Sequence, residues 1–253
     1  MRVAVGCPVR NRAWILPDYI EHVRAAFFLA GLEPYWVFNI GSGPNGMDDG
    51  TRHIVTDLYK EGQGVWTEST EPDIPKERAW NYERYEQMAA YRNQLLSLVR
   101  YSKADYFLSL DSDILIHPSA LVCLLDTIQN SRPQSAESYG AVGGKAYLSE
   151  RSADITTFGE IHASGSGSGI RRRDSDGVFQ TQILMAIKLM SPAAYNIDYT
   201  AHALGEDIGW SLACAKAGVV LGWDGRVCSK HIMKQYNDRG ESLIELVDQR
   251  VGW

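Results

Sequence analysis

A short apolar segment that ends in two acidic residues constrains the fold of this chain most. Residues 105–115 read Asp-Tyr-Phe-Leu-Ser-Leu-Asp-Ser-Asp-Ile-Leu, so Asp111 and Asp113 directly follow the run that starts at Tyr106. A short apolar run of this kind is typical of a strand buried on both faces, as in a parallel sheet. In open α/β sheets, ligands bind beyond the carboxyl ends of the strands. The sequence therefore predicts an α/β protein with a ligand site at this edge.

The two aspartates admit two interpretations. Neighbouring carboxylates repel one another unless protons or a cation intervene, and hard divalent ions take carboxylate oxygens together with substrate phosphates. Alternatively, the aspartates cap the helix that residues 117–121 predict. Because a cap needs only one acidic residue near the helix start, the pair favours a metal site.

Length and composition indicate a globular protein. The chain has 253 residues, which fits one large α/β domain or two small ones, and because no linker divides it we expect one domain over residues 1–253. The apolar fraction of 45% and the charged fraction of 22% exclude a disordered or fibrous class. A net charge of -6 argues against a broad basic surface for nucleic acid.

Cysteine and hydropathy patterns predict a cytoplasmic protein without a membrane span. The cysteines lie far apart and form no Cys-x-x-Cys pair, so we expect a reducing compartment and neither a zinc ribbon nor a redox motif. The first residues lead into a predicted strand rather than a signal peptide. The longest apolar run, residues 25–32, is too short to cross a bilayer.

Strand and helix signals alternate along the chain. In the first half, they predict strands at residues 3–7, 35–40 and 105–110 and helices at residues 18–30, 51–59 and 83–101. In the second half, they predict helices at residues 119–129 and 208–216 and strands at residues 139–147, 179–189 and 219–223. Residues 62–75 carry few periodic signals, so an irregular surface segment is expected there. The tail from Lys234 is polar, with a short helical signal at residues 243–247.

A glycine-serine run at residues 164–169 interrupts the second half. It lies within residues 149–176, and its composition is typical of flexible chain. The run is either a lid that closes over a bound ligand or a disordered excursion, and nothing local decides between them. It is not a P-loop, because the Gly-x-x-x-x-Gly-Lys-Ser/Thr pattern is missing.

Five short motifs and a late histidine occur in a characteristic order. They are Pro8-Val9-Arg10-Asn11-Arg12, Val37-Phe38-Asn39-Ile40-Gly41-Ser42, Tyr91-Arg92-Asn93-Gln94-Leu95, Asp111-Ser112-Asp113, Gly205-Glu206-Asp207 with Trp210, and His231. In this order they resemble the nucleotide-sugar-dependent glycosyltransferases of the GT-A fold, in particular the family-2-like members, over most of the chain. The resemblance implies one Rossmann-like, mostly parallel sheet flanked by helices. It also implies a nucleotide-binding half at residues 1–117, an acceptor half at residues 118–233 and a C-terminal tail at residues 234–253.

The resemblance implies a metal site that joins the two halves. Asp113 and His231 would coordinate Mn²⁺ or Mg²⁺ between the two phosphates of the donor, while Asp111 would contact the ribose or the metal and its water. An imidazole ligand favours Mn²⁺, because Mg²⁺ prefers oxygen ligands. For His231 alone, the alternative is a polar turn residue beside Lys230.

The resemblance also implies a nucleotide site and a donor class. The residues that correspond to it are Pro8, Val9, Arg10, Asn11, Asn39, Arg92, Asp111 and Ser112. A UDP-sugar donor is expected, although Asn39 stands where the family usually has an acidic residue that contacts the base or ribose. For Arg10 and Arg92, the alternative is a surface ion pair.

Glu206 and Asp207 form a second acidic pair. By itself, such a pair at a helix start indicates capping, because the helix dipole favours negative charge there. The resemblance implies instead that Asp207 is the catalytic base of an inverting transfer and that Glu206 orients the acceptor or a loop. Trp210 would stack on a sugar or pack in the core. The acceptor stays open: a saccharide, a protein, a lipid-linked sugar or a modified nucleic-acid base.

Two rival functions are compatible with parts of this pattern. Phosphohydrolases of the haloacid dehalogenase type also have an apolar strand that ends in Asp-x-Asp, but they expect Gly-Thr soon afterwards, where this chain has Ile114-Leu115. A non-catalytic nucleotide-sugar or carbohydrate-binding module would keep the fold without turnover. Such a module has no need of a catalytic base, so the retention of Asp207 argues against it.

Overall fold

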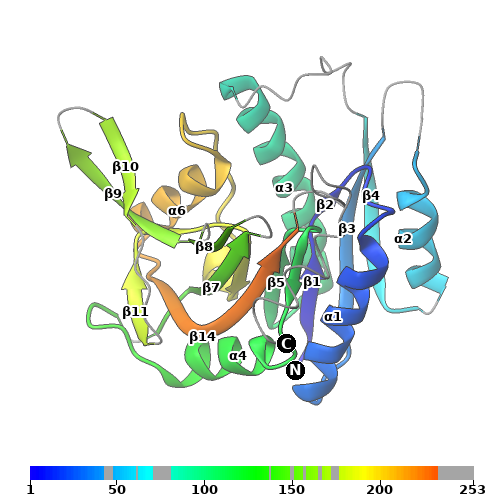
Figure 1. Ribbon diagram of the computed structural model, residues 1–253, viewed down its shortest axis with the longest axis horizontal. Helices are drawn as coiled ribbons and strands as arrows, with labels where there is room; N and C mark the ends of the chain where they lie inside the picture. The colour runs from blue at the N-terminus through cyan, green and yellow to red at the C-terminus, as the bar shows by residue number, and fades with distance from the viewer. Residues whose placement is uncertain are drawn as a thin grey trace.

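The protein is an α/β structure built on one open sheet (Figure 1). The computed structural model describes residues 1–42, 48–60, 62–70, 81–136, 138–148, 151–155, 158–164, 167–171 and 177–232. In that part of the chain the large sheet has 11 strands, of which eight follow the order β11-β14-β7-β13-β5-β1-β3-β2. Strand β4 pairs with β3, β6 pairs with β14, and β8 pairs with β7. The expected fold class, an α/β protein with a mostly parallel sheet flanked by helices, is confirmed.

The first half of the chain forms the parallel part of this sheet. Its strands are β1 Val3–Gly6, β2 Pro8–Val9, β3 Tyr35–Ser42, β4 Gly64–Thr70 and β5 Tyr106–Leu110. Strand β1 lies between β3 and β5 and runs parallel to both. Its four residues are all buried, as expected for a strand covered on both faces.

The remaining strands of the sheet follow β5 along the chain. They are β6 Ile114–Ile116, β7 Ala141–Leu148, β8 Arg151–Ile155, β11 Val178–Thr181, β13 Ile187–Met190 and β14 Leu221–His231. Strand β13 pairs antiparallel with both β5 and β7 and so joins the two halves into one sheet. The division into residues 1–117, 118–233 and 234–253 stays a prediction, and the tail from residue 233 lies outside the described residues.

Helices cover both faces of the sheet. They are α1 Leu16–Leu29, α2 Thr51–Lys60, α3 Tyr82–Ser102, α4 Ala120–Asn130, α5 Pro192–Tyr195 and α6 Glu206–Lys216. Helices α1, α2 and α4 pack with Val3 and Val5 in one core cluster. Helices α3, α5 and α6 pack with Ala4 and Val37 in the other. Alternate residues of β1 therefore face opposite layers, which explains the uninterrupted apolar runs of its sequence.

Two expectations about the chain's regular structure were wrong, and one alternative interpretation is excluded. Residues 64–70, expected to be irregular, form edge strand β4, in which Val65 and Thr67 are less exposed than Trp66 and Glu68. The predicted strand at residues 179–189 is divided into β11, β12 Ile183–Leu184 and β13. The aspartates do not cap α4, because β6 intervenes and Ser119 is the N-cap residue.

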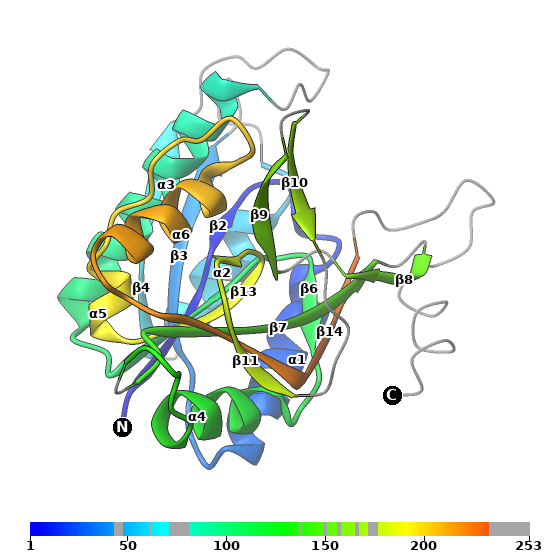
Figure 2. The same ribbon diagram turned by 90° about the vertical axis from the view of Figure 1, so that its left-hand side faces the viewer.

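The segment with the glycine-serine run contains a hairpin. Strands β9 Phe158–Ser164 and β10 Gly167–Arg171 pair antiparallel, with Gly167 opposite Ser164, and β9 also pairs with β12. The hairpin projects beside α6 (Figure 2). The tip, residues 165–166, lies outside the described residues, so the choice between a lid and a disordered excursion stays open there.

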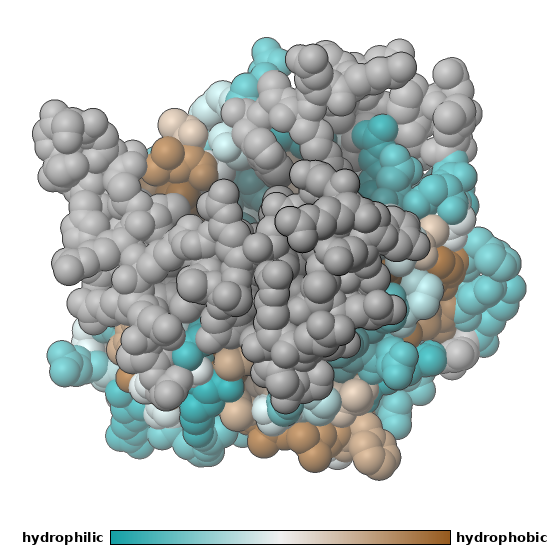
Figure 3. Space-filling view, viewed as in Figure 1, coloured by the Kyte–Doolittle hydropathy of each residue, from teal (hydrophilic) through white to brown (hydrophobic). Residues whose placement is uncertain are grey.

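Part of the surface near α1 and α4 is apolar. Hydrophobic residues lie along the lower edge of the face in Figure 3, near α1 and α4, and Phe28, Leu29 and Val122 on these helices are exposed. None of the four cysteines, all of which lie in the described part of the chain, forms a disulfide. Among the described residues, no helix is long and apolar enough to cross a membrane.

Candidate active site

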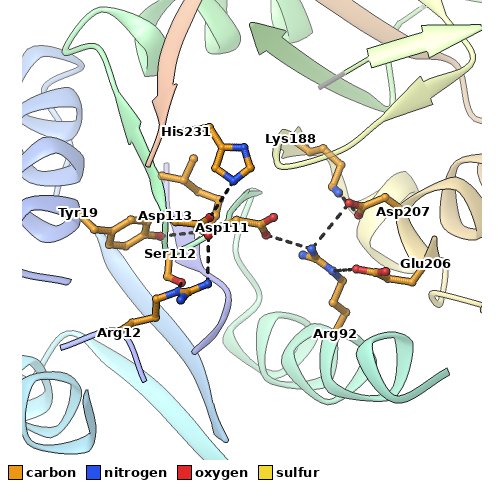
Figure 4. Close-up of polar contacts among 11 residues, drawn as sticks. Arg12, Tyr19, Arg92, Asp111, Ser112, Asp113, Lys188, Glu206, Asp207 and His231 are labelled. Atoms are coloured by element: carbon orange, nitrogen blue, oxygen red, sulfur yellow. Dashed lines mark hydrogen bonds and ion pairs between the residues drawn. The ribbon is translucent and has the colours of Figure 1, made fainter. Parts of the chain in front are cut away.

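Polar residues from both halves converge beyond the carboxyl end of β5 (Figure 4). They form two groups. The Asp113 cluster consists of Arg12, Ser112, Asp113 and His231, and the Arg92 cluster consists of Arg92, Asp111, Lys188, Glu206 and Asp207. The Asp-Ser-Asp turn between β5 and β6 contributes to both clusters.

Strand pairing brings Asp113 and His231 together. Strand β6 pairs with the end of β14 so that Ile114 lies opposite His231. The amide of Ile232 donates to the carbonyl oxygen of Asp113 at 2.8 Å. His231 Nε2 then lies 3.6 Å from Asp113 Oδ1. The predicted juxtaposition of these two side chains is therefore present, and His231 is the last residue of a strand rather than a turn residue.

Arg12 completes the Asp113 cluster. Its Nη2 lies 3.1 Å from Asp113 Oδ2, and its Nε donates to Ser112 Oγ at 3.2 Å. The backbone amide of Arg12 donates to Thr51 Oγ1 at 2.7 Å, which fixes the loop after β2 against the start of α2. The motif was identified from the sequence, but the contact with the carboxylate is made by Arg12 rather than by Arg10.

The Asp113 cluster is charged and partly open. Burial acts to raise the pKa of Asp113, but the hydrogen bond and charge of His231, together with Arg12, hold it below its usual value. Burial acts to lower the pKa of His231, and Asp113 outweighs this effect and raises it. The side chains of Arg12, Asp113 and His231 keep 17%, 15% and 19% of their exposure, so a ligand can reach them.

Arg92 links the two halves of the site. Its Nη2 lies 3.0 Å from Asp111 Oδ1, and its Nε lies 3.1 Å from Glu206 Oε1. The same Nη2 lies 3.8 Å from Asp207 Oδ2. Arg92 is 4% exposed, so it is not a surface ion pair. In this structure it connects three carboxylates that follow β5 or begin α6.

Lys188 is a member of this cluster that sequence reasoning missed. It lies in β13, is completely buried, and its Nζ lies 2.5 Å from Asp207 Oδ1. The available signal was a lysine between Ile187 and Leu189, inside an otherwise apolar strand. Such a lysine needs a buried partner, but its identity depends on the tertiary fold.

Charge and burial shift the pKa values of the acidic side chains of the Arg92 cluster in different directions. Burial raises the pKa of Asp111, and Arg92 offsets only part of this effect. Burial and the neighbouring charge of Asp207 likewise raise the pKa of Glu206. For Asp207, burial acts upward, but Arg92 and Lys188 outweigh it and hold its pKa below the usual value. Asp207 is therefore the carboxylate that the cluster keeps ionised most strongly.

Backbone geometry places Glu206 and Asp207 at the start of α6. Gly205 is the N-cap residue with φ of +125°, a conformation that residues with a Cβ rarely adopt. Gly209 faces Thr200 so closely that a Cβ would lie 1.9 Å from its carbonyl oxygen. The two acidic side chains contact Arg92 and Lys188. Capping alone therefore does not account for them.

The other predicted site residues range from exposed to completely buried. Pro8 and Val9 form β2, and Asn11 is exposed with φ of +52°. Asn39 is buried, and its side-chain amide groups bond to Tyr91 O, Gln94 Oε1 and Ser69 Oγ. Trp210 is completely buried and stacks on Tyr199 with 5.6 Å between ring centroids. Core packing therefore explains Trp210, and stacking on a sugar does not.

The donor atoms near Asp113 fit a divalent cation in part. A carboxylate and an imidazole suit Mn²⁺, and the buried Nδ1 of His231 has no hydrogen-bond partner. Among the residues that the structure describes, no three His, Cys, Asp or Glu side chains converge closely enough to hold a metal. Asp113 and His231 are the side chains that would hold such a cation.

Comparisons with known proteins identify the fold. No family model matches the chain, and no curated protein matches its sequence. The structure of GalNAc-T7 with UDP, GalNAc and Mn²⁺ is similar over 100% of this chain, with a TM-score of 0.58 and 10% identity. The structure of S. aureus TarS 1-349 in complex with UDP is similar over 99% of this chain, with a TM-score of 0.51 and 13% identity.

The two similar structures are GT-A glycosyltransferases. This chain spans 48% of the GalNAc-T7 chain and 65% of the TarS chain. At this identity the likeness establishes the fold. The chain therefore has a GT-A-like fold, as its motifs predicted.

Proposed function

We propose that this protein is a metal-dependent glycosyltransferase that transfers a sugar from a UDP-sugar to an acceptor hydroxyl. One observation carries the proposal: within a GT-A-like fold, the side chains of Asp113 and His231 meet, and the Arg92 cluster with Asp207 lies beside them. This arrangement supports a cation site for the diphosphate beside a carboxylate that serves the acceptor. The acceptor is a saccharide, a protein, a lipid-linked sugar or a modified nucleic-acid base.

In the proposed reaction, Asp113 and His231 would hold Mn²⁺ or Mg²⁺, with Mn²⁺ preferred. When bound, the ion would supply positive charge for the departing diphosphate. Asp111 would contact the ribose or the metal and its water. Ser112, Pro8 and Val9 of β2, and the following Arg10 and Asn11 line the nucleotide. Arg12 adds a second positive charge beside Asp113. Asn39 supports the nucleotide indirectly, because its amide groups already bond to protein.

Asp207 is the proposed base of an inverting transfer. The acceptor oxygen bonds to C1 of the sugar, and the bond from C1 to the diphosphate breaks with its electron pair on the diphosphate. The acceptor proton passes to Asp207, which requires this carboxylate to be ionised. The low pKa of Asp207, held down by Arg92 and Lys188 against the effect of burial, meets that requirement near neutral pH. Glu206 orients the acceptor side through its contact with Arg92.

Ligand-induced stabilisation tests the cation site. A ligand that binds only the folded state raises the melting temperature by mass action. UDP and Mn²⁺ together should stabilise the protein by more than the sum of their separate effects. Asp113→Ala should abolish this synergy, whereas the control Asp57→Asn, at an exposed surface pair, should retain it. Synergy that survives in Asp113→Ala would refute the proposed cation site.

Measurements of turnover distinguish the proposed glycosyltransferase from a binding module and from a phosphohydrolase. UDP-sugars with Mn²⁺ and a panel of acceptors should release UDP, and Asp207→Asn should lower the rate by about 100-fold or more, as expected for loss of a general base. UDP binding without any turnover would favour a binding module. Phosphate release from simple monoesters that Asp111→Asn abolishes would favour a phosphohydrolase, although here Arg92 occupies an oxygen of Asp111.

A further inference from the structure

Lys188 is a charged side chain in an otherwise apolar part of the core. It lies in the middle strand of three, opposite Ser109 of β5 and Gly143 of β7, and it is completely buried. Its neighbours in the strand, Ile187 and Leu189, are also completely buried. Burying an ammonium group costs several kcal/mol unless a partner compensates for the lost hydration. An alternative apolar residue would avoid this cost, so the charge calls for an explanation.

The surroundings of Lys188 hold its ammonium group in one place. Nζ lies 2.5 Å from Asp207 Oδ1. It also lies 5.5 Å from the ring centroid of Tyr199 and 5.4 Å from that of Trp210, within the range of cation–π attraction. Because those two rings are stacked and buried, the lysine has little freedom to move.

Asp207 is therefore held between two cations that come from different elements. Lys188 approaches Oδ1 from the sheet, and Arg92 approaches Oδ2 from α3 at 3.8 Å (Figure 4). The longer distance leaves Oδ2 as the oxygen that is less tightly held.

We propose that Lys188 is the positioning residue of Asp207: it anchors one carboxylate oxygen from the floor of the sheet and keeps Asp207 charged and aimed at the acceptor hydroxyl. The inference rests on the proposed function and deepens it, because it assigns the state of the base to a residue that does not touch substrate. It separates two tasks within the Arg92 cluster. Arg92 connects the donor and acceptor carboxylates, and Lys188 serves Asp207 alone.

The charges around Asp207 determine the expected effect of removing Lys188. The groups that face Asp207 are Arg92 of α3, Lys188 of β13, Glu206 of α6, Asp111 after β5 and Tyr199 before α6. Loss of the lysine removes one of two attractive charges and leaves burial and the acidic neighbours acting to raise the pKa of Asp207. The carboxylate then takes up a proton at a higher pH, so the acidic limb of the rate profile moves upward.

The test compares three variants in UDP release from a UDP-sugar with Mn²⁺. Lys188→Met removes the charge, Lys188→Arg keeps it, and Lys145→Met is the matched control. Lys145 is a lysine of β7 with 4% exposure, located near Trp223. We expect Lys188→Met to lower kcat by about tenfold or more at neutral pH, within the range that a general base supplies, with little change in the Kd of UDP. Its acidic limb should move to higher pH, whereas the limb should stay in place in Lys188→Arg and Lys145→Met.

A titration of Asp207 in the protein without substrate tests the role of Lys188 independently of turnover. Carboxyl ¹³C NMR, assigned by comparison with Asp207→Asn, follows the titration of Asp207 in the protein alone. In the unaltered protein Asp207 should titrate below its usual pKa, and in Lys188→Met it should titrate at higher pH. This measurement also tests the proposal if Lys188→Met does not fold. An ordinary or raised pKa of Asp207 in the unaltered protein would overturn the proposal.

The remaining outcomes separate the two proposals. A pH profile of Lys188→Met that coincides with that of Lys145→Met would show that Lys188 is merely structural and would overturn the inference. If the unaltered protein released UDP from no nucleotide sugar, the proposed function would fail. The NMR titration would then still show whether Lys188 holds Asp207 ionised.

Discussion

The Asp113 cluster and the Arg92 cluster lie side by side and, apart from Asp111 with a side chain 29% exposed, the charged side chains of the Arg92 cluster are the less exposed. In the Asp113 cluster, the side chains of the ion pair between Arg12 and Asp113 keep 17% and 15% of their exposure. In the Arg92 cluster, the pair of Lys188 and Asp207 keeps 0% and 11%. The first cluster can therefore exchange its internal contacts for a ligand, and the second is held together by its own counter-ions.

This difference in exposure predicts different roles for the two clusters. In this prediction, the Asp113 cluster binds the ligand, and the Arg92 cluster positions Asp207. Ion pairs near water are screened and contribute little to stability, whereas a buried pair that loses one partner leaves an uncompensated charge. Substitutions in the Asp113 cluster should mainly alter ligand binding, and substitutions in the Arg92 cluster should mainly alter the fold and the aim of the base. Three predictions test this contrast, starting from the largest effect.

Arg92→Met should have the largest effect on stability. It would leave three carboxylates without their shared cation, and breaking a buried pair typically costs about 3–5 kcal/mol of unfolding free energy. Urea denaturation measures this loss. The control Arg100→Met breaks the pair of Arg100 with the largely exposed Asp198 and should cost about 1 kcal/mol or less from that pair. Equal losses in the two variants would contradict the contrast between the clusters.

Gly209→Ala should have an intermediate effect through the position of α6. The added Cβ meets the backbone oxygen of Thr200, so the helix that carries Asp207 must move. Overpacking of this kind costs about 1–3 kcal/mol, and the displaced carboxylate should also reduce kcat. Leu212→Ala, on an exposed part of the same helix, is the control and should change stability by about 0.5 kcal/mol or less. Full activity in Gly209→Ala would show that α6 does not need this close contact.

Arg12→Gln should have the smallest effect on stability, about 1 kcal/mol or less, because its ion pair is partly exposed. It should increase the stabilisation by Mn²⁺ alone, since a cation that competes for Asp113 has been removed. Thermal shift with and without Mn²⁺ measures both effects. Arg52→Gln, which breaks the surface pair with Glu68, is the matched control and should leave the response to Mn²⁺ unchanged.

Local signals in the sequence predicted the elements that carry the site. The apolar run that forms β5 and the acidic turn after it follow from residues close together in the chain, and so does the start of α6 at Glu206. The meeting of Asp113 with His231 depends on the pairing of β6 with β14. Periodicity does not reveal that pairing, and only the resemblance to GT-A glycosyltransferases pointed to it.

The missed features share a physical cause. Strand β4 is half exposed and alternates Val65, Thr67 and Ser69 with more exposed residues, a weaker signal than a buried apolar run. In the sequence, Lys188 interrupts an apolar strand. Its partner, Asp207, lies in α6, and their contact depends on the tertiary fold. The place of Asn39 at the nucleotide stays a prediction, and its hydrogen bonds to α3 and β4 depend on helix and strand placement that no local pattern specifies.

The register of β14 has a consequence for how this protein tolerates insertions and deletions. His231 lies opposite Ile114 on one side and Leu148 on the other, and successive strand residues point to opposite faces. Adding or removing a single residue between the irregularity at Trp223/Cys228 and the strand end would reverse that parity and carry the imidazole away from Asp113. A two-residue change would keep the parity but move His231 two positions along the strand, so length changes in this stretch are compatible with the site only where the irregularity absorbs them.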